Sequence, residues 1–252
     1  MKSKVLGCIF GGVFFLFSAN GYCLETEDVI FINKLIQNFK SGNVSNIADE
    51  INYPLKRDYP IPSINNKEEF MARFGEVFDK VLIEKIVKSI PDKDWERVGW
   101  RGIMLGNGDL WLDGDKILAV NYQSEEEKTL QLKLIQDEKL KLHPSLRNYA
   151  TPVLSAKTKN YLLRIDELEN GKYRYSSWGA KKDQSQEPDI VLNNGQRVPD
   201  GSGGNHFYLF RNGEYTYRFL VIVLGENDSP PGELEVNKGE KSILREPVIY
   251  LK

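Results

Sequence analysis

Turn dipeptides recur through the last hundred residues of the chain, and they restrict its fold more than any other feature. Asn-Gly occurs at 170–171, 194–195 and 212–213, and Asp-Gly at 200–201; Pro-Pro-Gly and Lys-Gly follow at 230–232 and 238–239. Asn-Gly and Asp-Gly favour tight hairpins, because both central residues of the turn need a positive φ. The expected strands between them are 161–165, 172–178, 190–192, 207–210, 215–224, 234–236 and 248–251. We therefore predict an all-β, sandwich-like domain over residues 152–252.

The first half of the chain has a different pattern. Apolar residues recur at helical spacing through 25–40, 44–51, 66–78 and 81–90. Asn107-Gly108 and Asp113-Gly114 then predict a three-stranded antiparallel meander over 98–122. In 126–142 the alternation of leucines indicates a strand, whereas the Glu, Lys, Gln and Leu composition indicates a helix, which we favour. We predict an α+β domain over 24–143 and a linker at 144–151.

Helices followed by a meander that begins Trp100-Arg101-Gly102-Ile103 and continues through 108–112 resemble the cystatin-like, or nuclear transport factor-like, cone fold. The resemblance covers residues 25–122. It implies helices packed on one face of the meander and a concave opposite face. This fold group contains enzymes and many non-catalytic modules, so the resemblance implies no particular activity. Residues 152–252 resemble no specific family.

The N-terminus has the pattern of a secretory signal peptide. Lys2 and Lys4 precede an apolar run from 5 to 17, and small residues follow it. Cleavage after Gly21 and cleavage after Cys23 both satisfy the small-residue rule. Asn20 and Tyr22 occupy the positions where a lipobox has an aliphatic and a small residue, which argues against lipidation of Cys23. We expect a periplasmic or secreted bacterial protein with 1–23 as signal peptide.

Composition narrows the range of partners. The two cysteines, at 8 and 23, both lie in the predicted signal peptide, so a disulfide framework is not expected in the mature chain. The formal charge of −2 gives no indication of a nucleic-acid partner, and no second apolar run predicts a membrane span. Two histidines provide too few ligands for a zinc site, and we expect no metal and no cofactor.

Tyrosine and arginine alternate in the predicted strands 172–178 and 215–224. Alternate residues of a strand share a face, so Tyr215, Tyr217 and Phe219 lie on one face and Arg218 on the other; Arg174 is likewise opposite its neighbouring tyrosines. The tyrosine-rich face is either a domain core or a recognition surface for a glycan or a protein. We interpret Tyr217 as core, and Arg218 and Arg174 as candidate binding residues.

The remaining candidates lie in loops and in the meander. His206 follows a glycine-rich loop that leads into a strand, which fits a binding loop but not a phosphate-cradling motif. Trp100 and Trp111, with Asp109, are candidates on a concave face. Asp109, Asp113 and Asp115 flank hairpin turns, so we interpret them as turn residues and not as a calcium loop. No residue has the spacing of a catalytic motif.

These observations predict an exported, non-catalytic binding protein of the bacterial envelope. Its target is a protein, as for an inhibitor or an immunity protein against a secreted toxin. The alternatives are a module that binds envelope glycan (peptidoglycan), and a hydrolase with its site on the concave face of the first domain. The sequence does not determine the oligomeric state.

Overall fold

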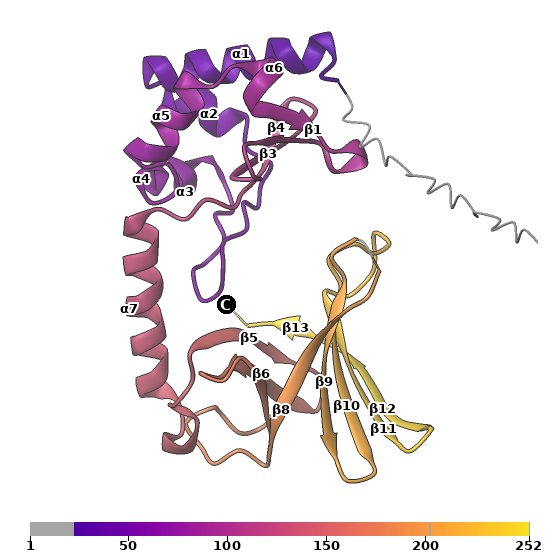
Figure 1. Cartoon of the computed structure of the whole chain (residues 1–252). Helices are drawn as coiled ribbons and strands as arrows, with labels where there is room; N and C mark the ends of the chain where they lie inside the picture. The colour runs from indigo at the N-terminus through magenta and orange to yellow at the C-terminus, as the bar shows by residue number, and fades with distance from the viewer. Residues whose placement is uncertain (1–22, 202, 252) are drawn as a thin grey trace, which may run out of the picture.

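A computed structural model describes residues 23–251 with the exception of residue 202, and the predicted signal peptide up to residue 22 lies outside the described residues. The described chain is α+β, with helices and two antiparallel sheets. Figure 1 shows a helical unit with a small sheet, the long helix α7 along one side, and a large curled sheet. The mixed fold class predicted from the sequence is therefore confirmed at this level.

The N-terminal unit contains short helices around a four-stranded meander. Its helices are α1 (Thr26–Ser41), α2 (Val44–Asp49), α3 (Lys67–Ala72), α4 (Phe74–Val77), α5 (Lys80–Lys88), α6 (Pro91–Asp94) and the 3-10 turn η1 (Gly99–Arg101). Its strands are β1 (Trp95–Arg97), β2 (Ile103–Leu105), β3 (Leu110–Asp113) and β4 (Lys116–Val120), paired in that order. The predicted meander is present, with β1 added at its edge.

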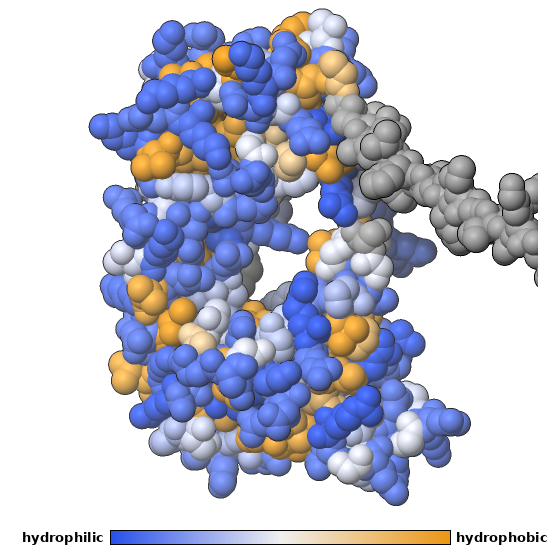
Figure 2. Space-filling model, in the orientation of Figure 1, coloured by the Kyte–Doolittle hydropathy of each residue, from blue (hydrophilic) through white to orange (hydrophobic). Residues whose placement is uncertain are grey.

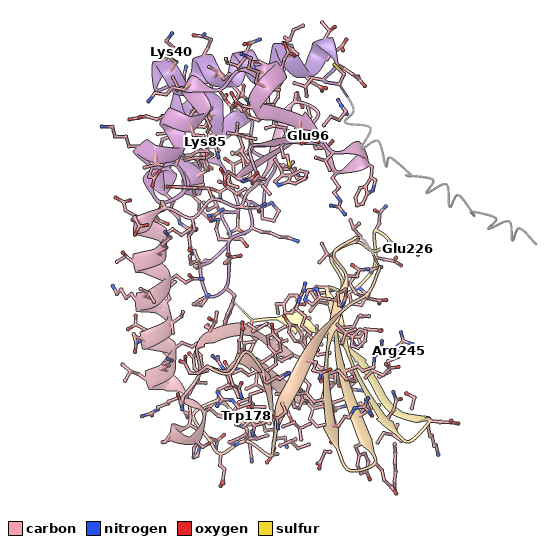
Figure 3. All side chains as sticks on the ribbon, viewed as in Figure 1. Lys40, Lys85, Glu96, Trp178, Glu226 and Arg245 are labelled. Atoms are coloured by element: carbon pink, nitrogen blue, oxygen red, sulfur yellow. The ribbon has the colours of Figure 1, made fainter. Side chains whose placement is uncertain are left out.

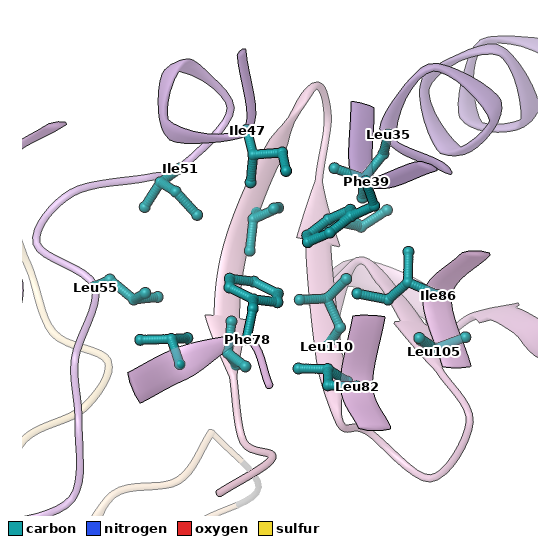
Figure 4. Close-up of a cluster of buried hydrophobic side chains, with 14 of the residues drawn as sticks. Leu35, Phe39, Ile47, Ile51, Leu55, Phe78, Leu82, Ile86, Leu105 and Leu110 are labelled. Carbon is teal, nitrogen blue, oxygen red and sulfur yellow. The ribbon is translucent and has the colours of Figure 1, made fainter. Parts of the chain in front are cut away.

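One face of this small sheet packs on the helices. Leu105 and Leu110 of the sheet lie against Phe39, Phe78 and Leu82 of α1, the end of α4 and α5 (Figure 4). Gly102 permits the close pairing of β2 and β3. Its φ is +97°, and a Cβ there would lie 2.1 Å from the Leu112 carbonyl oxygen, so only glycine fits.

Residues 125–141 form helix α7 (Glu125–Lys141), as their composition favoured. Ser124 caps it by accepting a hydrogen bond from Glu127 N at 3.0 Å, and its own hydroxyl donates to Glu76 O at 2.6 Å. Of the alternating leucines that suggested a strand, Leu132 is 63% exposed, whereas Leu130 and Leu134 are half-buried. The helix therefore contacts the N-terminal unit at its start and continues to the second unit.

The C-terminal unit is one curled, nearly closed antiparallel sheet of nine strands in the order β12-β11-β10-β9-β8-β7-β6-β5-β13. The strands are β5 (Thr151–Lys157), β6 (Tyr161–Glu167), β7 (Tyr173–Gly179), β8 (Ile190–Pro199), β9 (His206–Asn212), β10 (Tyr215–Val221), β11 (Gly232–Lys238), β12 (Lys241–Pro247) and β13 (Ile249–Tyr250). The all-β prediction is correct, but two separate packed sheets are not present.

Strand β8 explains this difference. Its first part pairs with β7 and its last four residues pair with β9, so the sheet continues through it. Asn194-Gly195, which we predicted as a turn, lies inside β8, where Asn194 has a φ of 63°. A Cβ on Gly195 would lie 2.1 Å from the Phe210 ring, so glycine allows this ring to pack against the bend.

The segment predicted as a linker is packed against the second unit. Residues 144–146 form the 3-10 turn η2 (Pro144–Leu146), and Leu146 and Tyr149 are fully buried. They form a cluster with Ile135 of α7 and with Trp178, which lies at the end of the sheet nearest η2 (Figures 1 and 3). Helix α7 and residues 144–149 thus cover one face of β6 and β7.

Candidate functional site

A pocket of about 510 Å³ lies between the two units. One wall is the extended segment 56–65 of the N-terminal unit, which reaches toward the curled sheet (Figure 1). The other wall consists of parts of β5, β9, β10 and β13 at one mouth of that sheet. Figure 2 shows that the molecular surface is open between its upper and lower parts. The volume is within the range of about 300–1,000 Å³ that is common for ligand sites.

The segment 56–65 is fixed at its base by a buried arginine. The Arg57 guanidinium donates to both carboxylate oxygens of Glu127, and further to Val120 O and, at 3.1 Å, to Tyr122 O. The Arg57 side chain is 5% exposed and that of Glu127 is 1% exposed. A bidentate pair of this kind has a fixed geometry, so it holds the segment against the start of α7.

A second residue of the segment, Tyr59, is bound to α7. The Tyr59 hydroxyl donates to Glu138, near the C-terminal end of that helix. Burial raises the pKa of Tyr59, and the neighbouring Glu138 carboxylate raises it further, so this phenol stays protonated and can donate. Segment 56–65 is therefore held at both ends of α7, and between them Gln131 Nε2 donates to Tyr59 O at 3.3 Å.

The sheet side of the pocket contains three aromatic rings. Tyr208 is buried, His206 lies edge-on to it with 5.4 Å between ring centroids, and Tyr250 donates its hydroxyl to Pro231 O at 3.2 Å. His206 Nδ1 lies 2.9 Å from Gly204 O, to which it donates, leaving Nε2 as an acceptor in the neutral ring. Burial lowers the pKa of His206, Arg197 lowers it further, and the bond to Gly204 opposes them.

The pocket lining is mostly apolar, and among the described residues no carboxylate side chain contributes to it. Its apolar side chains come from both walls: Pro60, Ile61, Pro62, Val153, Leu154, Val221 and Leu251. The charged side chains of the lining are the basic Lys56 and Arg57. Arg57 is neutralised by Glu127, whereas Lys56 is exposed and has no ion pair among the described residues. The lining therefore suits an apolar group with a negative charge near the rim.

A buried network of ion pairs connects strands β6 and β7 of the curled sheet with helix α7. Arg164 Nη2 donates to Glu138 Oε2 at 3.0 Å and lies 2.7 Å from Asp166 Oδ1, and Arg174 Nη2 donates to Asp166 Oδ2 at 2.7 Å. Arg174 Nη2 also donates to Leu146 O at 2.6 Å. Arg174, which we predicted as a binding residue, is buried here beneath residues 144–149. Its guanidinium holds that segment to the sheet.

Trp100 and Trp111, the two tryptophans predicted as candidate binding residues, lie in the N-terminal unit and do not line the pocket. Trp100 is 70% exposed in η1, and Trp111 pairs with Met104 and Ala119 across the small sheet. The carboxylate of Asp109, the acid we grouped with them, forms an ion pair with Lys85 of α5. The structure does not bring these residues together with His206.

Arg218 lies outside the pocket as well, on β10. Its guanidinium lies 2.8 Å from Glu235 Oε2 and stacks over the Phe207 ring at 4.3 Å. Tyr215 and Tyr217 pack against the core cluster that contains Phe219, which is the arrangement expected from their alternation. Of the five predicted binding residues, His206 alone lines the pocket between the units.

The sequence analysis missed the other wall of the pocket. The position of segment 56–65 opposite the sheet depends on Arg57 and Tyr59, whose partners lie 63 to 79 residues further along the chain. Tyr250 and Leu251 join the pocket only because β13 pairs with Ala156 and Lys157 of β5. No local pattern signals either contact.

Two features of residues 23–251 (without residue 202) concern membranes and metals. No helix in this range is long and apolar enough to cross a bilayer. No group of three or more His, Cys, Asp or Glu side chains in the same range is placed to hold a metal ion. Comparison of the chain with protein-family models, with curated proteins and with solved structures found no match.

Proposed function

We propose that this chain is an exported, non-catalytic binding protein that holds a segment of another protein in the pocket between its two units. One observation carries the proposal: the pocket is built from both units, is largely apolar, and has no carboxylate side chain in its lining within the described part of the chain. An inhibitor or an immunity protein against a secreted toxin is a protein-directed role of this kind.

The free edge of β5 supports an extended peptide as the occupant. β13 pairs with Ala156 and Lys157, and Leu251 N donates to Ser155 O at 2.8 Å. The earlier residues of β5, which include Val153 and Leu154 of the lining, have no strand beside them on that edge among the described residues. An extended segment placed there adds a strand to the sheet and directs alternate side chains into the pocket.

The charges of the lining indicate the composition of that segment. Lys56 is the unpaired cation at the rim, and the pocket floor is aliphatic and aromatic. An acidic side chain near Lys56 and apolar side chains deeper in the pocket would match it. The electrostatic part of this recognition is expected to weaken at high ionic strength, because Lys56 is exposed to solvent.

The polar groups of the lining favour binding over hydrolysis. Ser155 Oγ accepts a hydrogen bond from Gln184 at 2.5 Å, and His206 Nδ1 is occupied by Gly204 O and not by a carboxylate. A serine nucleophile needs a base in hydrogen-bond contact and a group that orients that base. The hydroxyls of Ser63 and Ser155 lack this arrangement within the described residues.

The proposal also includes the fold of the N-terminal unit, export of the protein and its division into two domains. We propose a cone-type fold for residues 25–122, which the helices on one face of the meander support. Export with cleavage after Gly21 or Cys23 and the two-domain division are likewise proposals that rest on the sequence.

Two matched substitutions test the protein-directed function. Val221 lines the pocket, whereas Val223, two residues later, is exposed and outside it. Envelope extract is passed over immobilised wild type, Val221→Lys and Val223→Lys, and the retained proteins are identified by mass spectrometry. We expect one protein to be retained by wild type and Val223→Lys and lost with Val221→Lys. Identical retention by all three proteins contradicts the proposal, as does the absence of any protein specific to the wild type.

A further inference from the structure

The curled sheet has a second pocket, of about 230 Å³, at its other mouth. The two pockets lie toward opposite ends of β10: Val221 lines the first, and Tyr215 and Tyr217 line the second. Both border the same core cluster of the sheet, which contains Phe219. The second pocket is formed by the C-terminal unit alone, so it does not depend on segment 56–65.

Four tyrosines from three strands converge on this second pocket: Tyr161, Tyr175, Tyr215 and Tyr217. The rings of Tyr175 and Tyr217 are 5.7 Å apart, with 42° between their planes. Burial raises the pKa of Tyr175, and the nearby phenols of Tyr217 and Tyr161 contribute to the increase. The rings of Tyr175 and Tyr217 are therefore neighbours in the wall of this pocket.

The polar groups of the second pocket are hydroxyls and no charged side chain lines it. Ser177 adds a fifth hydroxyl to the four phenols. Among the described residues, nothing hydrogen-bonds to the hydroxyls of Tyr161, Tyr215 and Tyr217. A phenol can both donate and accept, so these groups suit a ligand that also carries hydroxyls. A charged ligand would enter without a counter-charge, which is costly in a partly buried site.

The shape and the size of the pocket narrow the choice further. Leu234, Val236 and the tyrosine rings provide an apolar wall, on which a ring with C–H groups on its face can pack. The volume is below the range common for drug-sized ligands, so one six-membered ring and not a long chain fits it. A pyranose combines an apolar C–H face with a rim of hydroxyls.

We propose that the second pocket binds a neutral pyranose sugar, with the tyrosine rings against its C–H face and the Tyr161, Tyr215 and Tyr217 hydroxyls bonded to its rim. This site is separate from the pocket proposed to bind protein. Binding of the sugar is therefore expected to survive Val221→Lys, so each proposal can fail without the other.

The test uses the full chain, with its tyrosine rings labelled for NMR, and methyl β-D-glucopyranoside as the probe. We expect saturable shifts with a Kd in the millimolar range. Loss of one hydrogen bond in Tyr217→Phe or Tyr161→Phe weakens binding about fivefold, since such a bond contributes roughly 1 kcal/mol. Tyr173→Phe is the matched control: it lies on the same strand as Tyr175 but outside both pockets, and binding should not change.

Two further probes decide the ligand class. Glucuronate has the same ring with a carboxylate and should bind more weakly than the neutral glucoside. Phenol has an apolar six-membered ring but only one hydroxyl, so it should also bind more weakly than the glucoside. The proposal is overturned if the glucoside does not saturate, if both pocket variants bind it as wild type does while keeping their melting temperature, or if glucuronate or phenol binds more tightly.

Discussion

Arg164 and Asp166 are adjacent along one face of β6, and both side chains are completely buried. Asp166 lies between two guanidinium groups, those of Arg164 and Arg174. Arg164 also pairs with Glu138, so Asp166 is the fully buried carboxylate of this network of ion pairs. Buried charges of this kind stabilise a fold only while each has its partner. The stability of the C-terminal unit therefore depends strongly on this one acid.

Asp166→Asn should destabilise the protein by about 3–5 kcal/mol, because it leaves two buried cations with only Glu138 to compensate them. The measurement is the free energy of unfolding from urea denaturation. Glu235→Gln is the control: it breaks the half-exposed pair with Arg218 and should cost less than about 1 kcal/mol. Similar decreases of the free energy of unfolding in the two variants would show that the buried ion pairs of Asp166 are not a main source of stability.

His206 gives a second prediction at this scale. Its pKa is lowered in the folded state, so the unfolded chain takes up its proton first, near pH 6.5. Stability is thus fully present above that pH and is lost as the pH falls through it toward the folded-state pKa. Between pH 7.5 and pH 5, the melting temperature of wild type should fall further than that of His206→Gln. Parallel decreases would mean that carboxylates alone cause the pH dependence.

Individual residues also show what the sequence could and could not predict. The alternation around Tyr217 correctly placed the tyrosines toward the core and Arg218 away from it, because a strand has a strict two-residue period. The same period put Arg174 on the opposite face from its neighbouring tyrosines. It did not show that α7 and residues 144–149 cover that face. Burial by a distant element has no local signature in the sequence.

At the scale of elements, hairpins with a clear turn dipeptide were predicted well, whereas β5 and β12 were not predicted. β5 begins with Thr-Pro, and β12 carries Lys241, Arg245 and Glu246 among its seven residues. Charges and proline are typical of strands at or near the edge of a sheet. They also remove the apolar pattern by which a strand is predicted. Asn194-Gly195 produced the opposite error, since the dipeptide forms a bend inside a strand.

The extended segment 56–65 supports the next prediction. Arg57→Ala leaves the Glu127 carboxylate buried without a partner and should cost about 3–5 kcal/mol of stability. It should also increase amide hydrogen exchange most strongly in residues 58–63. Arg245→Ala, which removes an exposed pair with Glu233, is the control and should change neither. An increase spread evenly over the chain would show that Arg57 supports the whole fold and not this segment.

At the scale of the whole molecule, the segment predicted as a linker, residues 144–151, contributes side chains to the core of the second unit. Trp178 is fully buried by Ile135 and Leu142 of the α7 region and by Leu146 and Tyr149. The C-terminal sheet therefore takes part of its core from residues that precede 152. The sequence suggests a boundary at His143-Pro144 because proline ends a helix, but the end of a helix is not the end of a core.

Two fragments test this sharing of the core. Residues 152–252 alone expose Trp178 and remove the carbonyl groups of Leu146 and Asn148 to which Arg174 donates. We expect no cooperative thermal transition for this fragment. Residues 124–252 retain α7 and should melt cooperatively. A cooperative transition of 152–252 close to that of 124–252 would show that the sheet folds independently of the helix.

The pocket between the units joins Lys56 to Leu251, two residues separated by most of the chain. Contacts between such distant residues have a high entropic cost of loop closure, and they tend to form late in folding. The two hydrophobic cores can assemble from nearer neighbours, so the pocket is expected to be the last feature to appear. Under the proposed function, a chain with both cores formed does not bind its partner until both walls of the pocket are in place, so binding would report on the completion of folding.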